Sequence, residues 1–142
     1  NQWTETVFAE AGYRKLDDPL DRILGYVDFR AAILDREIPQ FTCFLGTLVQ
    51  ETYGTHPAVR EACDRGMSAH IAGLTRDLDA AKRLYAPKAG WSAESVGYFI
   101  QAVLQGSFIF AKAKQDAAVA RQNLAHLKRY LISLFPVRPP RR

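Results

Sequence analysis

Cysteine, histidine and methionine are all scarce in this sequence. Among 142 residues there are two cysteines, three histidines and one methionine. Cys43 and Cys63 are too few for a disulfide framework, and such sparse use is typical of a reduced intracellular chain. The histidines, at positions 56, 70 and 126, are not spaced to share a metal ion on one helix face. The sequence therefore predicts neither a disulfide scaffold nor a metal site.

Long apolar runs and cofactor motifs are also missing. No stretch approaches the roughly 18 unbroken apolar residues of a membrane span, and the N-terminus has no basic stretch followed by an apolar core. A cytoplasmic protein without membrane contact is expected. There is no glycine-rich phosphate loop, no zinc pattern and no nucleophile turn. We therefore expect no cofactor and no enzymatic activity.

Positive charge is concentrated at one end of the chain. The formal net charge is +4, but Arg138, Arg141 and Arg142 lie in a proline-rich tail (136–142), and without them only +1 remains. The other basic residues are scattered among acids, as on a solvated helix surface. Specific DNA binding needs basic residues gathered on one face. The chain alone is therefore not expected to bind DNA specifically, and binding through the tail would be weak.

Helical periodicity runs through the chain, and no segment alternates like a strand. The patterns predict a single all-α domain, an antiparallel bundle of about five to six helices. Asp18 before Pro19, and Ser92 two residues before Glu94, are typical of helix starts. Gly12 and Pro39 are expected to end the first and second helices, and Asp116 to cap the last one. The expected helices are 2–11, 18–34, 41–53 (the central, most buried one), 57–85, 93–114 and 117–135.

The last two helical patterns carry more apolar surface than one small domain needs. The helix at 93–114 is apolar on two faces and must be covered on two sides. The helix at 117–135 has leucines at alternating steps of three and four, the narrow seam of a helix packed lengthwise on others. A homodimer built as a four-helix bundle is therefore predicted, through Ala102, Gly106, Ile109, Leu124, Leu127 and Leu131.

Several stretches resemble the C-terminal domains of TetR-family transcriptional regulators. They are Phe99–Gly106, Ala111–Ala113 and Leu124–Leu131 near the end of the chain, and Cys43–Leu48 and His56–Cys63 earlier. The similarity extends from about Asp17 to Phe135. It implies an all-helical regulatory domain that binds a small inducer and dimerises through its last two helices.

The family's helix-turn-helix domain has no counterpart in the sequence. It would normally precede Asn1, so the resemblance implies that residues 1–142 are one regulatory domain that meets DNA only through a missing N-terminal domain. The helix near Trp3 would link the two domains. An inducer would then act by changing the spacing of the DNA-binding heads.

Four helices have apolar stripes that must meet in the interior, and there we expect the inducer site. Its walls would suit a hydrophobic or aromatic small molecule rather than a highly charged one. Arg30, Gln101 and Gln105 are the polar groups best placed to orient it, although Arg30 could lie on the surface and Gln105 could face the dimer partner. The predicted walls are Tyr26, Phe29, Phe44, Leu48, Met67, His70, Leu74, Tyr98 and Phe99.

Two other interpretations stay open at this stage. The aromatic residues could simply fill a core, which would leave a plain helical dimerisation module without ligand. A helical enzyme or metal-binding bundle is the third interpretation, and it would need paired ligands or acid–base residues on facing helices. Instead of facing a ligand, His70 could form a hydrogen bond to another residue of the protein, because a buried imidazole needs a hydrogen-bond partner.

Overall fold

The chain folds into seven α-helices and two short 3-10 helices in the computed structural model, which describes residues 2–138 and, within the first helix, side chains only from Thr6 on. The α-helices are α1 (Gln2–Ala9), α2 (Pro19–Ala32), α3 (Ile38–Phe41), α4 (Phe44–Thr52), α5 (Pro57–Tyr85), α6 (Ala93–Lys114) and α7 (Ala118–Ser133). The 3-10 helices are Gly12–Lys15 and Ile33–Asp35. No strand occurs among the described residues, so the all-α prediction is confirmed.

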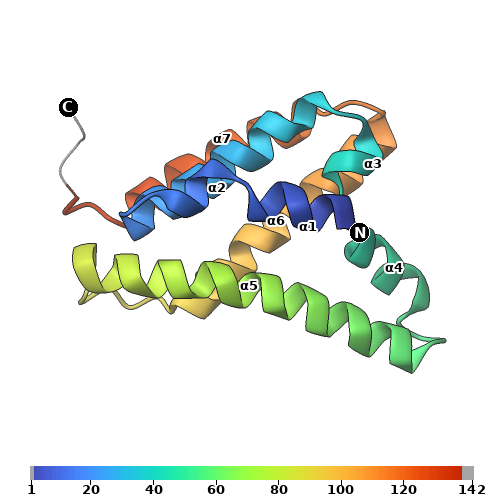
Figure 1. Ribbon diagram of the computed structural model, residues 1–142, viewed down its shortest axis with the longest axis horizontal. Helices are drawn as coiled ribbons and strands as arrows, with labels where there is room; N and C mark the ends of the chain where they lie inside the picture. Colours follow the sequence, from blue (N-terminus) through green and yellow to red (C-terminus); the bar gives the residue numbers. More distant parts are fainter. Residues whose placement is uncertain (1, 139–142) are drawn as a thin grey trace.

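The long helices form an antiparallel bundle with α6 at its centre. Figure 1 shows α2 and α7 side by side along one edge, α5 along the opposite edge, and α6 crossing between them. α4 lies at one end of the molecule, beside the first half of α5. The candidate site lies at that end of the molecule, and residues of α4, α5 and α6 line it.

The centre of the bundle is α6. It contributes more buried residues than any other helix: Ala93, Val96, Gly97, Ile100, Gln101, Leu104, Ser107, Phe108 and Ala111. Gly97 lets α5 approach closely, because a β-carbon there would stand 3.0 Å from Thr75 Oγ1 and 3.2 Å from Ile71 Cγ2. The inner face of α6 thus belongs to the monomer core, while its other face is left open.

Local capping signals mark the helix starts as predicted in two of three cases. Asp18 Oδ1 accepts from the backbone N–H groups of Leu20 (2.8 Å) and Asp21 (3.3 Å), and Ser92 Oγ accepts from that of Ser95 (3.1 Å). Asp116 also accepts from the Ala118 N–H at 2.7 Å, but the cap position of α7 is occupied by Ala117. The predicted cap was therefore one residue early.

The expectation of a central helix at 41–53 is wrong. The segment breaks at Thr42 and Cys43, and α4 packs chiefly against α5 at the edge of the bundle. Its Phe44 is 72% exposed, and only Gly46 in this helix is buried. An apolar composition predicted burial, but it carries no information on how many sides of a helix are covered.

The two expected helix stops also differ from the structure. Gly12 opens a 3-10 helix, and no glycine among the described residues has a positive φ, so it does not end α1 as a left-handed cap. Pro39 lies in the first turn of α3, where a proline is tolerated. The helix before it ends earlier, at Ala32, and tightens into the 3-10 turn Ile33–Asp35.

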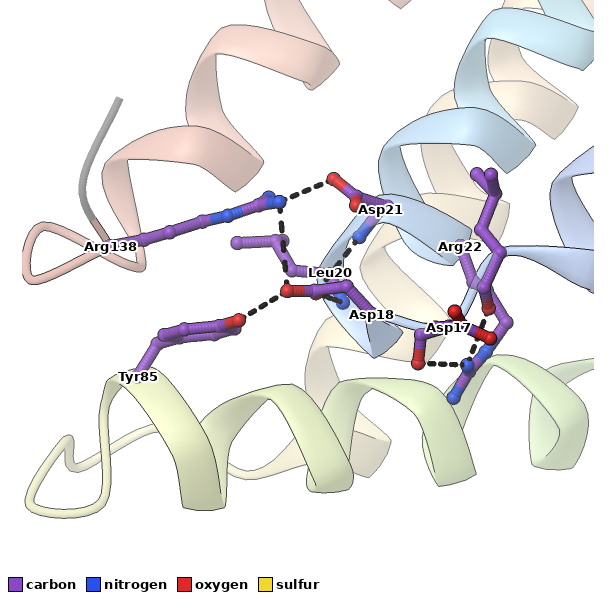
Figure 2. Close-up of polar contacts among 8 residues, drawn as sticks. Asp17, Asp18, Leu20, Asp21, Arg22, Tyr85 and Arg138 are labelled. Carbon is purple, nitrogen blue, oxygen red and sulfur yellow. Dashed lines mark hydrogen bonds and ion pairs between the residues drawn. The ribbon is translucent and has the colours of Figure 1, made fainter. Parts of the chain in front are cut away.

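A polar cluster ties the C-terminal segment to the start of α2. Figure 2 shows Asp18 between Tyr85, which donates a short hydrogen bond to its carboxylate, and Arg138, whose Nη2 lies 3.7 Å from Asp18 Oδ2. Arg138 also pairs with Asp21 and lies over the Tyr85 ring, 5.6 Å from its centroid. Beside them Arg22 Nε bonds Asp77 at 2.9 Å and joins α2 to α5.

Arg138 is therefore neutralised by carboxylates of its own chain. It is not free for the weak phosphate contacts expected of the tail, and Arg141 and Arg142 lie outside the described residues. Among residues 2–138, no helix is long and apolar enough to cross a membrane.

Candidate functional site

A cavity of about 550 Å³ lies between the C-terminal half of α2, the first half of α5, α6, α4 and the end of α1. That volume falls in the range of small-molecule sites. Most of its lining is apolar: Val7, Phe8, Ala9, Ile33, Pro39, Phe41, Phe44, Leu45, Met67 and Ile71. Its polar side chains are Arg14, Arg30, Gln40, Thr42, Cys43, His70, Gln101 and Gln105.

A chain of hydrogen bonds runs behind the cavity wall and joins three helices. Gln101 Nε2 on α6 donates to Tyr26 Oη on α2 at 2.8 Å. Tyr26 Oη lies 2.9 Å from His70 Nε2 on α5. The tyrosine hydroxyl thus accepts from Gln101 and shares a second hydrogen bond with His70 Nε2, so one group links both side chains. Tyr26 is only 1% exposed, so this chain fixes the three helices at the base of the cavity.

His70 is held in its neutral form. Burial, reinforced by the positive charges of Arg30 and Arg14, lowers the pKa of the imidazole from 6.5 to about 4. Burial also raises the pKa of the Tyr26 phenol. Both groups are therefore uncharged at neutral pH and act as hydrogen-bonding groups.

This shift predicts an acid-sensitive fold. Since the folded pKa of His70 lies below that of the unfolded chain, the stabilisation is complete above pH 6.5 and is lost as the pH falls toward 4. The shift corresponds to about 3 kcal/mol of unfolding free energy. Urea unfolding of the wild type and of His70→Gln across this pH range measures it. The wild type loses more stability than the variant, whereas parallel pH profiles would refute the assignment.

Arg30 is the other unusual group of the site. It is only 8% exposed, and Phe8 (5.2 Å), Phe108 (5.0 Å) and Tyr26 (6.0 Å) have their ring centroids near its guanidinium carbon. Its Nη2 donates to the Phe41 carbonyl at 3.5 Å, and its Nε has no hydrogen-bond partner. The alternative that Arg30 lies on the surface is therefore excluded.

The predicted wall residues separate into two groups. Phe44, Met67 and His70 line the cavity, and Tyr26 holds His70 by a hydrogen bond. The three predicted polar groups also line it: Arg30, Gln101 and Gln105. The others lie elsewhere. Phe29 packs edge-on against Phe8, Leu74 lies in the core, Leu48 is half-buried on α4, and Tyr98 and Phe99 are exposed on the outer face of α6.

Sequence reasoning missed the contribution of the N-terminal helix. Phe8 lines the cavity and contacts His70 (ring centroids 5.5 Å apart) as well as Arg30 and Tyr26. Phe41, Ile71 and the exposed Arg14 were missed as well. An eight-residue helix carries too short a periodic signal to reveal its partners, and the only hint was the apolar pair Val7–Phe8 in a polar stretch.

The residues predicted for the dimer interface also separate. Ala102, Gly106 and Ile109 lie on the open face of α6, and a β-carbon at Gly106 would meet nothing within 4 Å. Leu124, Leu127 and Leu131 are buried inside their own chain, where α7 packs on α2 and α6. The expectation that these leucines meet a second copy therefore does not fit the structure. Their spacing showed that α7 packs on helices, but not which ones.

The remaining candidate groups form no catalytic arrangement. Cys43 caps α4, its sulfur accepting from the Gly46 N–H at 3.3 Å, and Cys63 is buried on α5. His56 and His126 are exposed and bond to their neighbours Thr55 and Arg129. Within the described part of the chain, no three His, Cys, Asp or Glu side chains are grouped to hold a metal ion.

Comparison with known proteins gives one family. The family model described as the C-terminal domain of tetracyclin repressor-like proteins matches residues 19–127, which begin at α2 and end within α7. No curated protein and no solved structure matches the chain significantly.

Proposed function

Because the chain belongs to the tetracyclin repressor-like C-terminal domain family, we propose that it is the effector-sensing and dimerisation domain of a TetR-like transcriptional repressor. The observation that carries this proposal is the cavity between helices, with an apolar lining and a few convergent polar groups. Such a combination is typical of a small-molecule site. A hydrophobic or aromatic inducer fits the lining.

The route from the cavity to a DNA-binding domain would run through α1. Phe8 lies against His70, Arg30 and Phe29, so a ligand that displaces these side chains also displaces the end of α1. A helix-turn-helix domain joined to the N-terminal end of α1 would receive this movement. A ligand shifts such an equilibrium only by binding the two arrangements with different affinity.

The open face of α6 supports dimerisation. One side of the helix carries an uncharged stripe that no described helix covers: Tyr98, Phe99, Ala102, Gly106, Ile109, Phe110 and Ala113. Tyr130 of α7 extends it, with its ring 5.0 Å from that of Phe99. Exposed apolar surface of this extent is typical of an interaction site. We place the two-fold axis of a homodimer on this stripe.

Ligand binding is tested by filling the cavity. Met67 lines it, and Ala69 lies exposed on the same helix. We expect apolar compounds from a small-molecule library to raise the melting temperature of the wild type and of Ala69→Trp, but not of Met67→Trp. A ligand at one hundred times its Kd stabilises by about 2.7 kcal/mol, or several degrees.

Two outcomes would decide against the ligand role. If no compound raises the melting temperature of the wild type, the plain dimerisation module is the better description. If Met67→Trp responds like the wild type, the compounds bind elsewhere. Circular dichroism of both tryptophan variants checks that the fold is intact.

A further inference from the structure

Arg30 is a buried cation with no counter-ion among the described side chains. No aspartate or glutamate among the described side chains pairs with it, and its one hydrogen bond, to the Phe41 carbonyl, is long at 3.5 Å. The Nε–H has no acceptor within the part of the chain that the structure describes. The three neighbouring aromatic rings attract the charge but offer no in-plane acceptor for its N–H groups. A buried charge without a partner lowers the stability of the folded chain, unless a group of opposite charge pairs with it.

The described charged residues of the cavity lining are both positive. Its charged lining residues are Arg30 and Arg14, and the described lining contains no acidic side chain. His70 adds no charge, since its pKa is lowered to about 4. Arg14 is exposed at the rim, so the deep part of the cavity presents one permanent positive charge.

The rest of the cavity lining is suited to contact the apolar part of a ligand. The apolar lining includes residues from four different elements: Phe8, Phe41, Phe44, Met67 and Ile71. Phe44 is largely exposed, so its ring is free to pack against a ligand. Gln101 and Gln105 offer neutral polar groups beside the charge.

We propose that the cavity binds an amphipathic monocarboxylate, with its carboxylate on Arg30 and its aliphatic or aromatic body against the apolar lining. This inference rests on the proposed ligand-binding function and names the chemistry of the ligand. The ligand keeps the hydrophobic body expected from the sequence, and it gains one negatively charged group, the carboxylate.

A carboxylate fits better than the other common acceptor groups. The planar guanidinium donates two parallel hydrogen bonds to a carboxylate, and such charge-assisted pairs are the strong ones. A neutral carbonyl would leave the buried charge uncompensated. A phosphate dianion would bring two negative charges to a deep site with one positive charge, and the second would be buried unpaired.

Matched pairs of acids and their primary amides test the proposal. Calorimetric titrations of the whole chain at pH 7 and one fixed salt concentration would use decanoate against decanamide, phenylbutanoate against phenylbutanamide, and naphthylacetate against naphthylacetamide. In at least one pair we expect the acid to bind at least about tenfold more tightly than the amide, as a charge-assisted pair predicts. In Arg30→Met the preference falls to about one.

Two further variants isolate the role of Arg30. Arg14→Met removes the exposed rim charge and keeps the preference for the acid, because solvent and salt screen that charge. Arg30→Lys keeps the charge but loses the Nε–H and the planar fork, and gives an intermediate preference. If Arg30→Met loses its helical circular dichroism, Arg30→Gln replaces it in the comparison.

The outcomes distinguish the carboxylate assignment from the broader proposal that the cavity binds a small molecule. Amides that bind as tightly as their acids, or an acid preference that survives in Arg30→Met, would overturn the carboxylate assignment and leave the ligand-binding function standing. If neither member of any pair binds, the carboxylate assignment fails; a wild type that also ignores the wider library then removes the ligand-binding function as well.

Discussion

Leu127→Glu removes a large part of the unfolding free energy of the chain. Leu127 is 3% exposed and lies with Leu124 and Leu131 in the core between α7, α2 and α6. An ionised carboxylate at this position has no described partner, and the substitution costs at least about 4 kcal/mol. That is comparable with the whole stability of a domain, about 5–15 kcal/mol. Urea unfolding followed by circular dichroism measures the loss.

The matched control lies on the outer side of the same helix. Ile132 is half exposed, so Ile132→Glu changes the unfolding free energy by no more than about 0.5 kcal/mol. The two variants distinguish a core seam from an interface seam. If Leu127→Glu yields a well-folded monomer with a midpoint near that of the wild type, the leucines face a second copy and their placement in the core is incorrect.

We expect Ala102→Arg to convert the proposed dimer into a folded monomer. Ala102 is exposed at the middle of the open stripe of α6, one turn from Gly106. In a two-fold interface the substitution brings two arginines close together and removes an apolar contact from each copy. We expect the dimer Kd to rise at least about a thousandfold, which is about 4 kcal/mol. Analytical ultracentrifugation over a concentration series measures it.

The control changes charge away from the stripe. Lys88 lies exposed in the loop between α5 and α6, and Lys88→Glu leaves the dimer Kd within about twofold of the wild type, as expected for a surface substitution. A wild type that sediments as a monomer at micromolar concentration would refute the interface, as would an Ala102→Arg protein that stays dimeric.

Helix positions were predictable where a local signal marks the start. The boundaries of α5 and α6 follow from Pro57, from the Ser92 cap and from long periodic stripes, because these signals depend only on neighbouring residues. The placement of α4 was not predictable. Its apolar composition was read as burial, yet those side chains face a cavity and α5 rather than a surrounding core.

The site was predictable in part for the same reason. Met67 and His70 lie on a stripe of α5 whose direction is fixed by seven turns of periodicity, so their inward orientation followed from the sequence. Tyr98 and Phe99 lie on α6, which is apolar on both sides, and composition alone does not say which side turns inward. Phe8 reaches the cavity only because of the tertiary path of residues 10–18, which no local pattern encodes.

The polar cluster at Asp18 determines at which end of the molecule a tether or label can be attached. Arg138 is held beside Asp18, at the opposite end of α2 from Arg30, so the last described residue lies about 16 Å along that helix from the cavity. Figure 1 likewise shows the last turn of α7 at the end of the molecule away from α4. A surface tether or fluorophore attached on the C-terminal side of residue 138 would therefore start at the end of the molecule opposite the cavity. Immobilised-protein binding measurements are therefore best built from that end, with residue 138 and its two carboxylate partners left intact.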